Sequence, residues 1–140
     1  MLIPRRALLV SGAHSARIGA EAAAAALARG LRAGGAPEPD VALLDGDGAE
    51  QLAALGFDER LRDARAVIIA VAALDPHTIA RGVAFEVATR ARQTGVPAYA
   101  VARESRLSSF DARLLDLQLV LQARSVRALS AAGRRLAQVV

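Results

Sequence analysis

Three side chains whose types suit catalysis or ligand binding come directly after the most uniformly apolar run of the chain. The segment RAVIIAVAALDPHT ends in Asp75, His77 and Thr78. An acid and an imidazole close together are typical of proton transfer, so Asp75 and His77 are candidate catalytic residues and Thr78 is a candidate ligand-binding residue. The same letters also predict the start of a helix, with Asp75 as its N-cap and Pro76 in its first turn. The pattern leaves both interpretations open and favours the helix start.

A second candidate lies in SGAHSARIG, which separates the first apolar run from an alanine-rich helical pattern. Nucleotide-binding folds place a phosphate loop at this position, where backbone amides at a helix start hold an anion. Ser11, Gly12, His14 and Ser15 are therefore candidate ligand-binding residues. Gly12 and Gly19 are too far apart for a GxGxxG fingerprint, however. The pattern favours an ordinary turn with His14 exposed.

Alternating acids and glycines in DGDGAE form the third candidate. Carboxylates suit Mg²⁺, so Asp45 is a candidate catalytic residue and Gly46 and Asp47 are candidate ligand-binding residues, with a metal shared between an aspartate and a phosphate. The later ligands of an EF-hand are missing, which excludes that motif. The pattern favours a polar turn in which Asp47 caps the following helix, and no metal site of protein side chains alone is predicted.

The composition excludes several classes of function. The 140 residues carry 18 basic side chains and a net charge of +4, yet every basic residue is arginine, and cysteine is absent. The chain therefore has no Schiff-base lysine, no P-loop lysine and no thiolate chemistry. Aromatic residues make up only 3% and the arginines are scattered, which argues against a nucleic-acid partner. With no leader and no apolar run of ~20 residues, we expect a cytoplasmic protein and no membrane partner.

Apolar runs alternate with helical patterns along the chain. Strands are predicted at residues 6–10, 41–44, 66–71, 97–101 and 117–122. Helices or helical turns are predicted at residues 18–32, 49–55, 58–63, 76–94, 111–116 and 125–139, the last with Ser125 as its N-cap. This alternation predicts a single α/β domain over residues 1–140. We expect a three-layer, Rossmann-like sandwich, with a mostly parallel sheet of about five strands and helices on both faces.

Ligands bind such sheets at the carboxyl ends of the strands. The loops expected to matter are therefore residues 11–17, 45–48, 72–78 and 102–109. Arg103, in the last of these, is a candidate ligand-binding residue that would supply positive charge to a small phosphorylated or carboxylated metabolite. His14 and His77 would share a site only if their two loops converge.

The order of these segments resembles the glycerate 2-kinase family, which phosphorylates glycerate with ATP. The family's opening strand, D-S-F-K-G loop and alanine-rich helix have counterparts, in the same order, in RALLVSGAHSARIGAEAAAAALARGLR. The family's D-G-G-E-G-T loop is matched by Asp45 and Gly46 in VALLDGDGAEQL. A later segment of the family is matched by Leu74, Asp75 and Thr78, and a GVP turn follows it in both. The resemblance covers nearly the whole chain. It implies the family's first, Rossmann-like domain, with ATP and Mg²⁺ as cofactors.

The departures from the family concern its chemistry. The acid and the lysine of the D-S-F-K-G loop are replaced in GAHSA, and the second domain that the family inserts after D-G-G-E-G-T is missing. Phosphoryl transfer needs positioned cations and a closed cleft. We therefore expect a catalytically inactive, glycerate-kinase-like domain that acts through self-association as a dimer or through a protein partner. The alternative is a small-metabolite or nucleotide-binding enzyme with residual glycerate kinase-type phosphotransferase activity.

Overall fold

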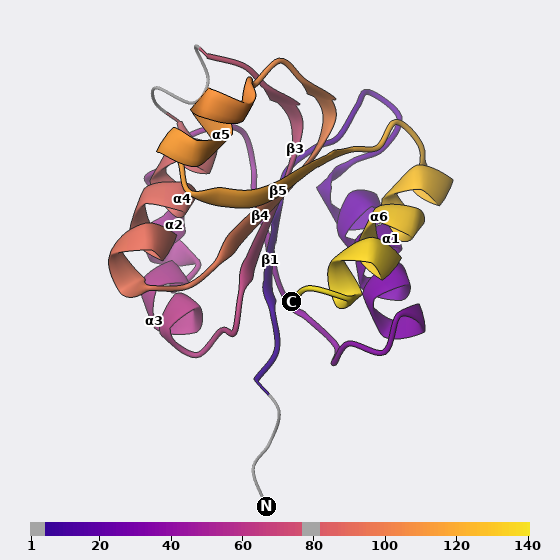
Figure 1. Cartoon of the computed structure of the whole chain (residues 1–140), viewed down its shortest axis with the longest axis horizontal. Coiled ribbons are helices and arrows are strands. Elements are labelled where there is room, and N and C mark those ends of the chain that lie inside the picture. The colour runs from indigo at the N-terminus through magenta and orange to yellow at the C-terminus, as the bar shows by residue number, and fades with distance from the viewer. Residues whose placement is uncertain (1–4, 77–81) are drawn as a thin grey trace, which may run out of the picture.

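The computed structural model describes residues 5–76 and 82–140, and its five strands form one sheet in the order β2-β1-β3-β4-β5 (Figure 1). Every pair of neighbouring strands is parallel. The strands are β1 (Leu8–Ser11), β2 (Asp40–Leu43), β3 (Val67–Leu74), β4 (Ala98–Ser105) and β5 (Leu117–Gln122). The predicted α/β class with a parallel sheet of five strands is confirmed.

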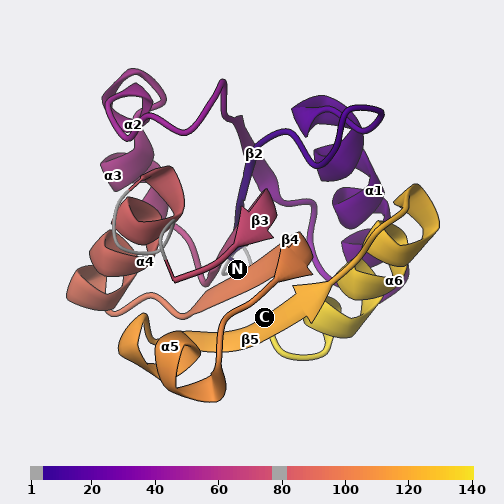
Figure 2. The same ribbon diagram turned by 90° about the horizontal axis from the view of Figure 1, so that it is seen from above.

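Helices cover both faces of the sheet, so the predicted three layers are confirmed as well (Figure 2). One face is covered by α1 (Ala20–Ala33) and α6 (Val126–Ala137). The other face carries α2 (Gln51–Ala54), α3 (Phe57–Arg62), α4 (Val83–Thr94) and α5 (Ser109–Leu114). As predicted, Ser125 caps α6, because its Oγ accepts the Ala128 N–H at 3.0 Å.

Each face of the sheet has its own hydrophobic core, and β3 contributes to both. Val67 and Ile69 belong to the core under α4, whereas Ile68 and Ala70 belong to the core under α1 and α6. Successive side chains of a strand point to opposite faces, so a central strand covered on both sides must be apolar at every position. This requirement explains the uniform run that the sequence shows here.

The predicted ends of two strands were wrong. β3 and β4 run on to Leu74 and Ser105, because Ala73 pairs with Glu104 and Leu74 with Ser105 beyond the predicted ends. The helix predicted from residue 76 begins later: α4 starts at Val83, and its N-cap is Gly82, which has φ 100°. Such a φ suits glycine, which has no Cβ. Residues 77–81, and with them His77 and Thr78, lie outside the described residues.

α1 and α6 approach each other through small residues. Gly30 of α1 and Gly133 of α6 are both buried, and a Cβ on Gly133 would lie 3.0 Å from the Gly30 Cα. Backbones can come this close only where no side chain separates them. The pair therefore fixes how α6 lies against α1 (Figure 2).

An ion pair joins the outer strand β2 to α3. The guanidinium of Arg60 donates from Nε to Asp40 Oδ2 at 2.9 Å and from Nη2 to Asp40 Oδ1 at 2.6 Å. The same Nη2 donates to the Val41 carbonyl at 2.7 Å. These bonds and the charge of Arg60 hold the pKa of Asp40 below its ordinary value, although partial burial of the carboxyl acts in the opposite direction.

This ion pair predicts a stability loss in acid. Because the pKa of Asp40 is lowered in the folded protein, its contribution is complete above the ordinary aspartate value of about 3.9 and is lost as the pH falls through the lowered pKa. Urea unfolding should show that the wild type loses more free energy of unfolding between about pH 6 and pH 3 than the Asp40→Asn variant loses. Equal losses in the two proteins would contradict the prediction.

Candidate functional site

The sheet order places a crevice outside the carboxyl ends of β1 and β3. After β1 the chain continues to β2 on one side, and after β3 it continues to β4 on the other side. The loops that follow these two neighbouring strands therefore leave in opposite directions (Figure 2). In open parallel sheets, ligands bind at such a reversal of the strand order.

A step in the sheet deepens this crevice. β1 pairs with β3 only as far as Ser11 and Ala70, whereas β3 continues beside β4 to Leu74. On the projecting end of β3, Ala72 and Ala73 are exposed and line two cavities, of about 550 Å³ and about 280 Å³. Alanine leaves room on both sides of the strand, so the end of β3 forms a wall that the two cavities share.

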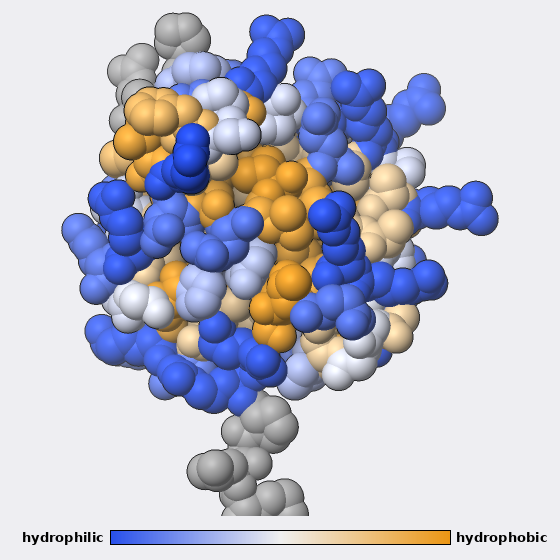
Figure 3. Space-filling view, in the orientation of Figure 1, coloured by the Kyte–Doolittle hydropathy of each residue, from blue (hydrophilic) through white to orange (hydrophobic). Residues whose placement is uncertain are grey.

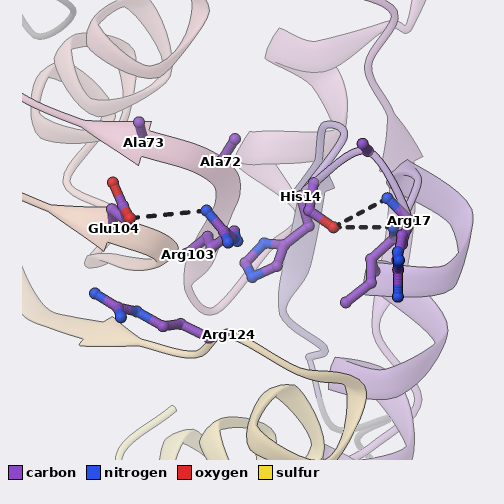
Figure 4. A pocket seen from close by; sticks show the side chains of 10 residues that line it. His14, Arg17, Ala72, Ala73, Arg103, Glu104 and Arg124 are labelled. Carbon is purple, nitrogen blue, oxygen red and sulfur yellow. Dashed lines mark hydrogen bonds and ion pairs between the residues drawn. The ribbon is translucent and has the colours of Figure 1, made fainter.

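Charged side chains from several segments surround the larger cavity. Its lining includes His14 and Arg17 from the loop after β1, Arg103 and Glu104 from β4, and Arg124 from the segment after β5 (Figure 4). Arg103 and Glu104 form a long ion pair, with 3.7 Å between Nη1 and Oε1. Among the described residues of the lining, three arginines outnumber one carboxylate, so this part of the cavity carries an excess of positive charge.

His14 is fully buried, so the expectation that it is exposed was wrong. Its Nε2–H donates to the Ala123 carbonyl at 2.5 Å, which ties the loop after β1 to the end of β5. Since a carbonyl can only accept, Nε2 carries the proton in this bond. The buried Nδ1 has no hydrogen-bond partner among the described residues. His14 therefore lines the larger cavity while its Nδ1 stays buried (Figure 4).

A tight turn holds His14 in this position. The Ile18 carbonyl accepts the N–H groups of both His14 and Ser15, at 2.9 and 3.0 Å. The Ser15 Oγ in turn accepts the N–H groups of Arg17 and Ile18, at 3.2 and 3.0 Å. Ser15 also lines the larger cavity, so this predicted ligand-binding residue lies at the site while its oxygen is engaged in the turn.

The other predicted residues of this loop have different surroundings. Ser11 is buried, and its Oγ donates to the Ala20 carbonyl at 3.0 Å at the start of α1. Gly12 donates its N–H to the Ala70 carbonyl at 2.8 Å and lines the smaller cavity. Ser11 thus anchors α1, whereas Gly12 faces the crevice.

The acidic turn reaches the smaller cavity through Gly46 and Asp47. The expectation that Asp47 caps the next helix was wrong: the N-cap of α2 is Glu50, and the Asp47 carbonyl instead accepts the Val83 N–H at 3.1 Å. Asp45 is exposed, donates its N–H to Gln51 Oε1 at 2.7 Å and is not among the residues that line either cavity. The smaller cavity is therefore lined by Gly12 and Ala13 from the loop after β1 and by Gly46 and Asp47 from this turn.

The described residues do not fit a nucleotide–Mg²⁺ site by themselves. They include no group of three or more acids or histidines that could hold a metal ion. Among the described lining of the smaller cavity, the one carboxylate is that of Asp47. Asp75 is half-buried directly after β3, and His77 and Thr78 lie outside the described residues.

Arg17 and Arg124 line the site but were not among the residues predicted from the sequence. Both come within a few residues of the carboxyl end of a strand, which is the signal that could have identified them. The segment after β5 was not expected to matter. Its contribution depends on the bond between His14 and Ala123, which no local pattern indicates.

No described helix combines the length and the apolar character needed to cross a bilayer. No protein-family model matches the chain, and no curated protein matches it either.

Proposed function

We propose that the domain binds a small anionic metabolite, one with a carboxylate or phosphate group, in the larger cavity. The observation that carries this proposal is the meeting of Arg17, Arg103 and Arg124 around one cavity, from three separate segments of the chain. The planar guanidinium offers paired N–H donors that match the oxygens of a carboxylate or a phosphate. Three such groups around one space favour an anion over a neutral ligand.

The size and the walls of the cavity support a metabolite-sized ligand. Its volume of about 550 Å³ lies within the range of small-molecule sites, roughly 300 to 1,000 Å³. Ala72 and Ala73 leave space for the ligand on one wall.

We also propose that the domain shares the frame of the first domain of the glycerate 2-kinase family and transfers no phosphate. The parallel sheet, with its loops at the carboxyl ends of the strands, supports the shared frame. The complete absence of lysine supports the loss of the transfer step, because the family's chemistry relies on a lysine in its first loop. Binding without transfer is the function that these observations favour.

A titration of the purified protein tests the binding proposal. Inorganic phosphate, glycerate, ADP and Mg-ATP are added separately at constant ionic strength, and the melting temperature is followed. A ligand present at a hundred times its Kd stabilises the folded state by about 2.7 kcal/mol, so at least one of these anions should raise the melting temperature by several degrees. No rise with any of them would contradict the proposal.

Two single arginine substitutions provide the matched comparison. Arg124→Ala removes a lining arginine, whereas Arg127→Ala removes an exposed arginine of α6 that is not in the lining. Both change the net charge equally. The response to the anion should be lost or at least tenfold weaker in Arg124→Ala and unchanged in Arg127→Ala, because one charged hydrogen-bonded pair contributes about 1.5 to 3 kcal/mol. Equal responses would show that the anion acts on the whole protein and not at this cavity.

A further inference from the structure

We propose that β5 is an interface strand, at which a second copy of the chain adds its own β5 in antiparallel orientation. The two sheets would then continue into one another across a two-fold axis at Val120. This inference concerns the free edge of β5. It shares Arg124 with the larger cavity but does not depend on the proposed ligand.

The outer edge of β5 is unpaired within the described part of the chain. β5 ends the sheet order and pairs only with β4. Ala123 donates its N–H to the Ala102 carbonyl of β4, and the backbone groups of a parallel strand alternate in direction. The N–H and C=O groups of Val120 and Gln122 therefore point away from β4, toward the free edge. Such a row of groups is a template for another strand.

The other edge of the sheet is protected. On β2, the carbonyl of Val41 accepts a hydrogen bond from Arg60 of α3, and the same arginine holds Asp40. A charged side chain across an edge strand is a common way to prevent further strand pairing. β5 has no such cover among the described residues, so its edge is open to pairing with another strand, whereas the edge at β2 is not.

Apolar surface surrounds the free edge. Leu119, Val120 and Leu121 are only partly buried, and the neighbouring helix α5 has no buried residue at all. On α5, Phe110 is 62% exposed and Leu114 57% exposed. Figure 3 shows apolar side chains gathered at the centre of this face, over β5, and at its upper left, over α5. A monomer would leave this surface in water, whereas an added strand would cover it.

The sequence of β5 is complementary to itself when it is reversed. Pairing about Val120 places Gln118 opposite the partner's Gln122 and Leu119 opposite the partner's Leu121. Asp116 precedes the strand and Arg124 follows it, so each acid faces the partner's arginine only in the antiparallel arrangement. Cross-strand pairs of opposite charge stabilise a sheet, and like charges destabilise it. This complementarity identifies the occupant of the edge as a second copy.

A β-bulge in β5 is compatible with this register. The partners of Ala98 and Tyr99 on β4 are Leu117 and Leu119, so Gln118 is an extra residue in the strand. Val120 packs against the core under α4, whereas Leu119 and Leu121 pack against the core under α1 and α6. Gln122, two residues after Val120, shares its face of the sheet. Gln118 lies at the bulge and, like Val120 and Gln122, lines the cavity of about 450 Å³ beside α5.

Charge substitutions at the two glutamines test both the interface and its register. Gln118 and Gln122 are exposed and line only the cavity beside α5, so changing them leaves the hydrophobic cores and the anion site intact. Gln118→Lys with Gln122→Lys places like charges opposite each other twice. Gln118→Glu with Gln122→Lys places opposite charges at the same positions. Sedimentation velocity over a range of concentrations gives the dimer dissociation constant of each protein.

We expect a dimer for the wild type, a dissociation constant roughly tenfold or more higher for the double-lysine variant, and a dimer at least as tight as the wild type for the glutamate–lysine variant. Circular dichroism of each variant confirms that it is folded. A wild type that remains monomeric up to about 1 mM would overturn the proposal, since a Kd above that value is no stable complex. Equal dissociation constants for the two variants would overturn the register and the interface with it.

Discussion

Replacing Gly30 by alanine will destabilise the protein by about 3 kcal/mol or more, although helix propensity alone predicts a gain of about 1 kcal/mol. The reason is the close approach of α1 and α6. A Cβ on Gly30 would overlap the Ser130 carbonyl oxygen and lie 2.9 Å from the backbone nitrogen of Arg134. Both are backbone atoms of α6, so the clash is relieved only if the two helices move apart.

Thermal and urea unfolding measure this effect. A loss of about 3 kcal/mol should lower the melting temperature of a domain of this size by about 10 °C. Arg29→Ala is the matched control, because Arg29 precedes Gly30 in the same helix and is exposed. It should change the free energy of unfolding by no more than about 0.5 kcal/mol. A Gly30→Ala variant as stable as the wild type would contradict the packing of α1 on α6 described above.

The second large effect is expected at His14. Replacing it by leucine keeps an apolar side chain in the buried site but removes the donor to Ala123. The Ala123 carbonyl, which lies in a buried residue, then has no described partner. Leaving a buried acceptor unpaired costs about 1 to 3 kcal/mol, and the free energy of unfolding should fall by that amount. The loop after β1 should also lose its connection to the end of β5.

His14→Gln separates the hydrogen bond from the volume of the ring. The glutamine amide carries an N–H at a similar reach, so it can still donate to Ala123. We expect urea unfolding to show a clearly smaller loss for His14→Gln than for His14→Leu. If both variants lose the same free energy, the bond contributes nothing measurable and the ring matters only through its packing.

Several features of the fold followed from local patterns in the sequence. The alternation of apolar runs with helical segments predicted five parallel strands and the sandwich, because a strand buried on both faces must be apolar throughout and a parallel connection needs a helix. β5 was predicted with its observed bounds, Leu117–Gln122, and Ser125 as the cap of α6. The Ser125 cap depends only on residues within one helical turn, so the sequence shows it directly.

Other features depended on pairing between distant segments. The extension of β3 to Leu74 is held by Ser105 of β4, and nothing within the letters ALDP indicates that partner. The same holds for Asp47, which bonds Val83 rather than its own helix. His14 was expected at the surface because histidine is polar, yet its bond to Ala123 makes burial possible.

The candidate site also combines features that follow from local sequence patterns with features that depend on distant segments coming together. The alternation of strands and helices predicted candidate loops after the strands, and Gly12, His14, Ser15, Gly46, Asp47 and Arg103 do line the two cavities there. The sequence by itself also determined that no lysine or cysteine takes part in the chemistry. Which loops lie side by side depends on the order of the strands in the sheet, and local periodicity carries no record of that order. The meeting of Arg17, Arg103 and Arg124, and the free edge of β5, are consequences of the order β2-β1-β3-β4-β5.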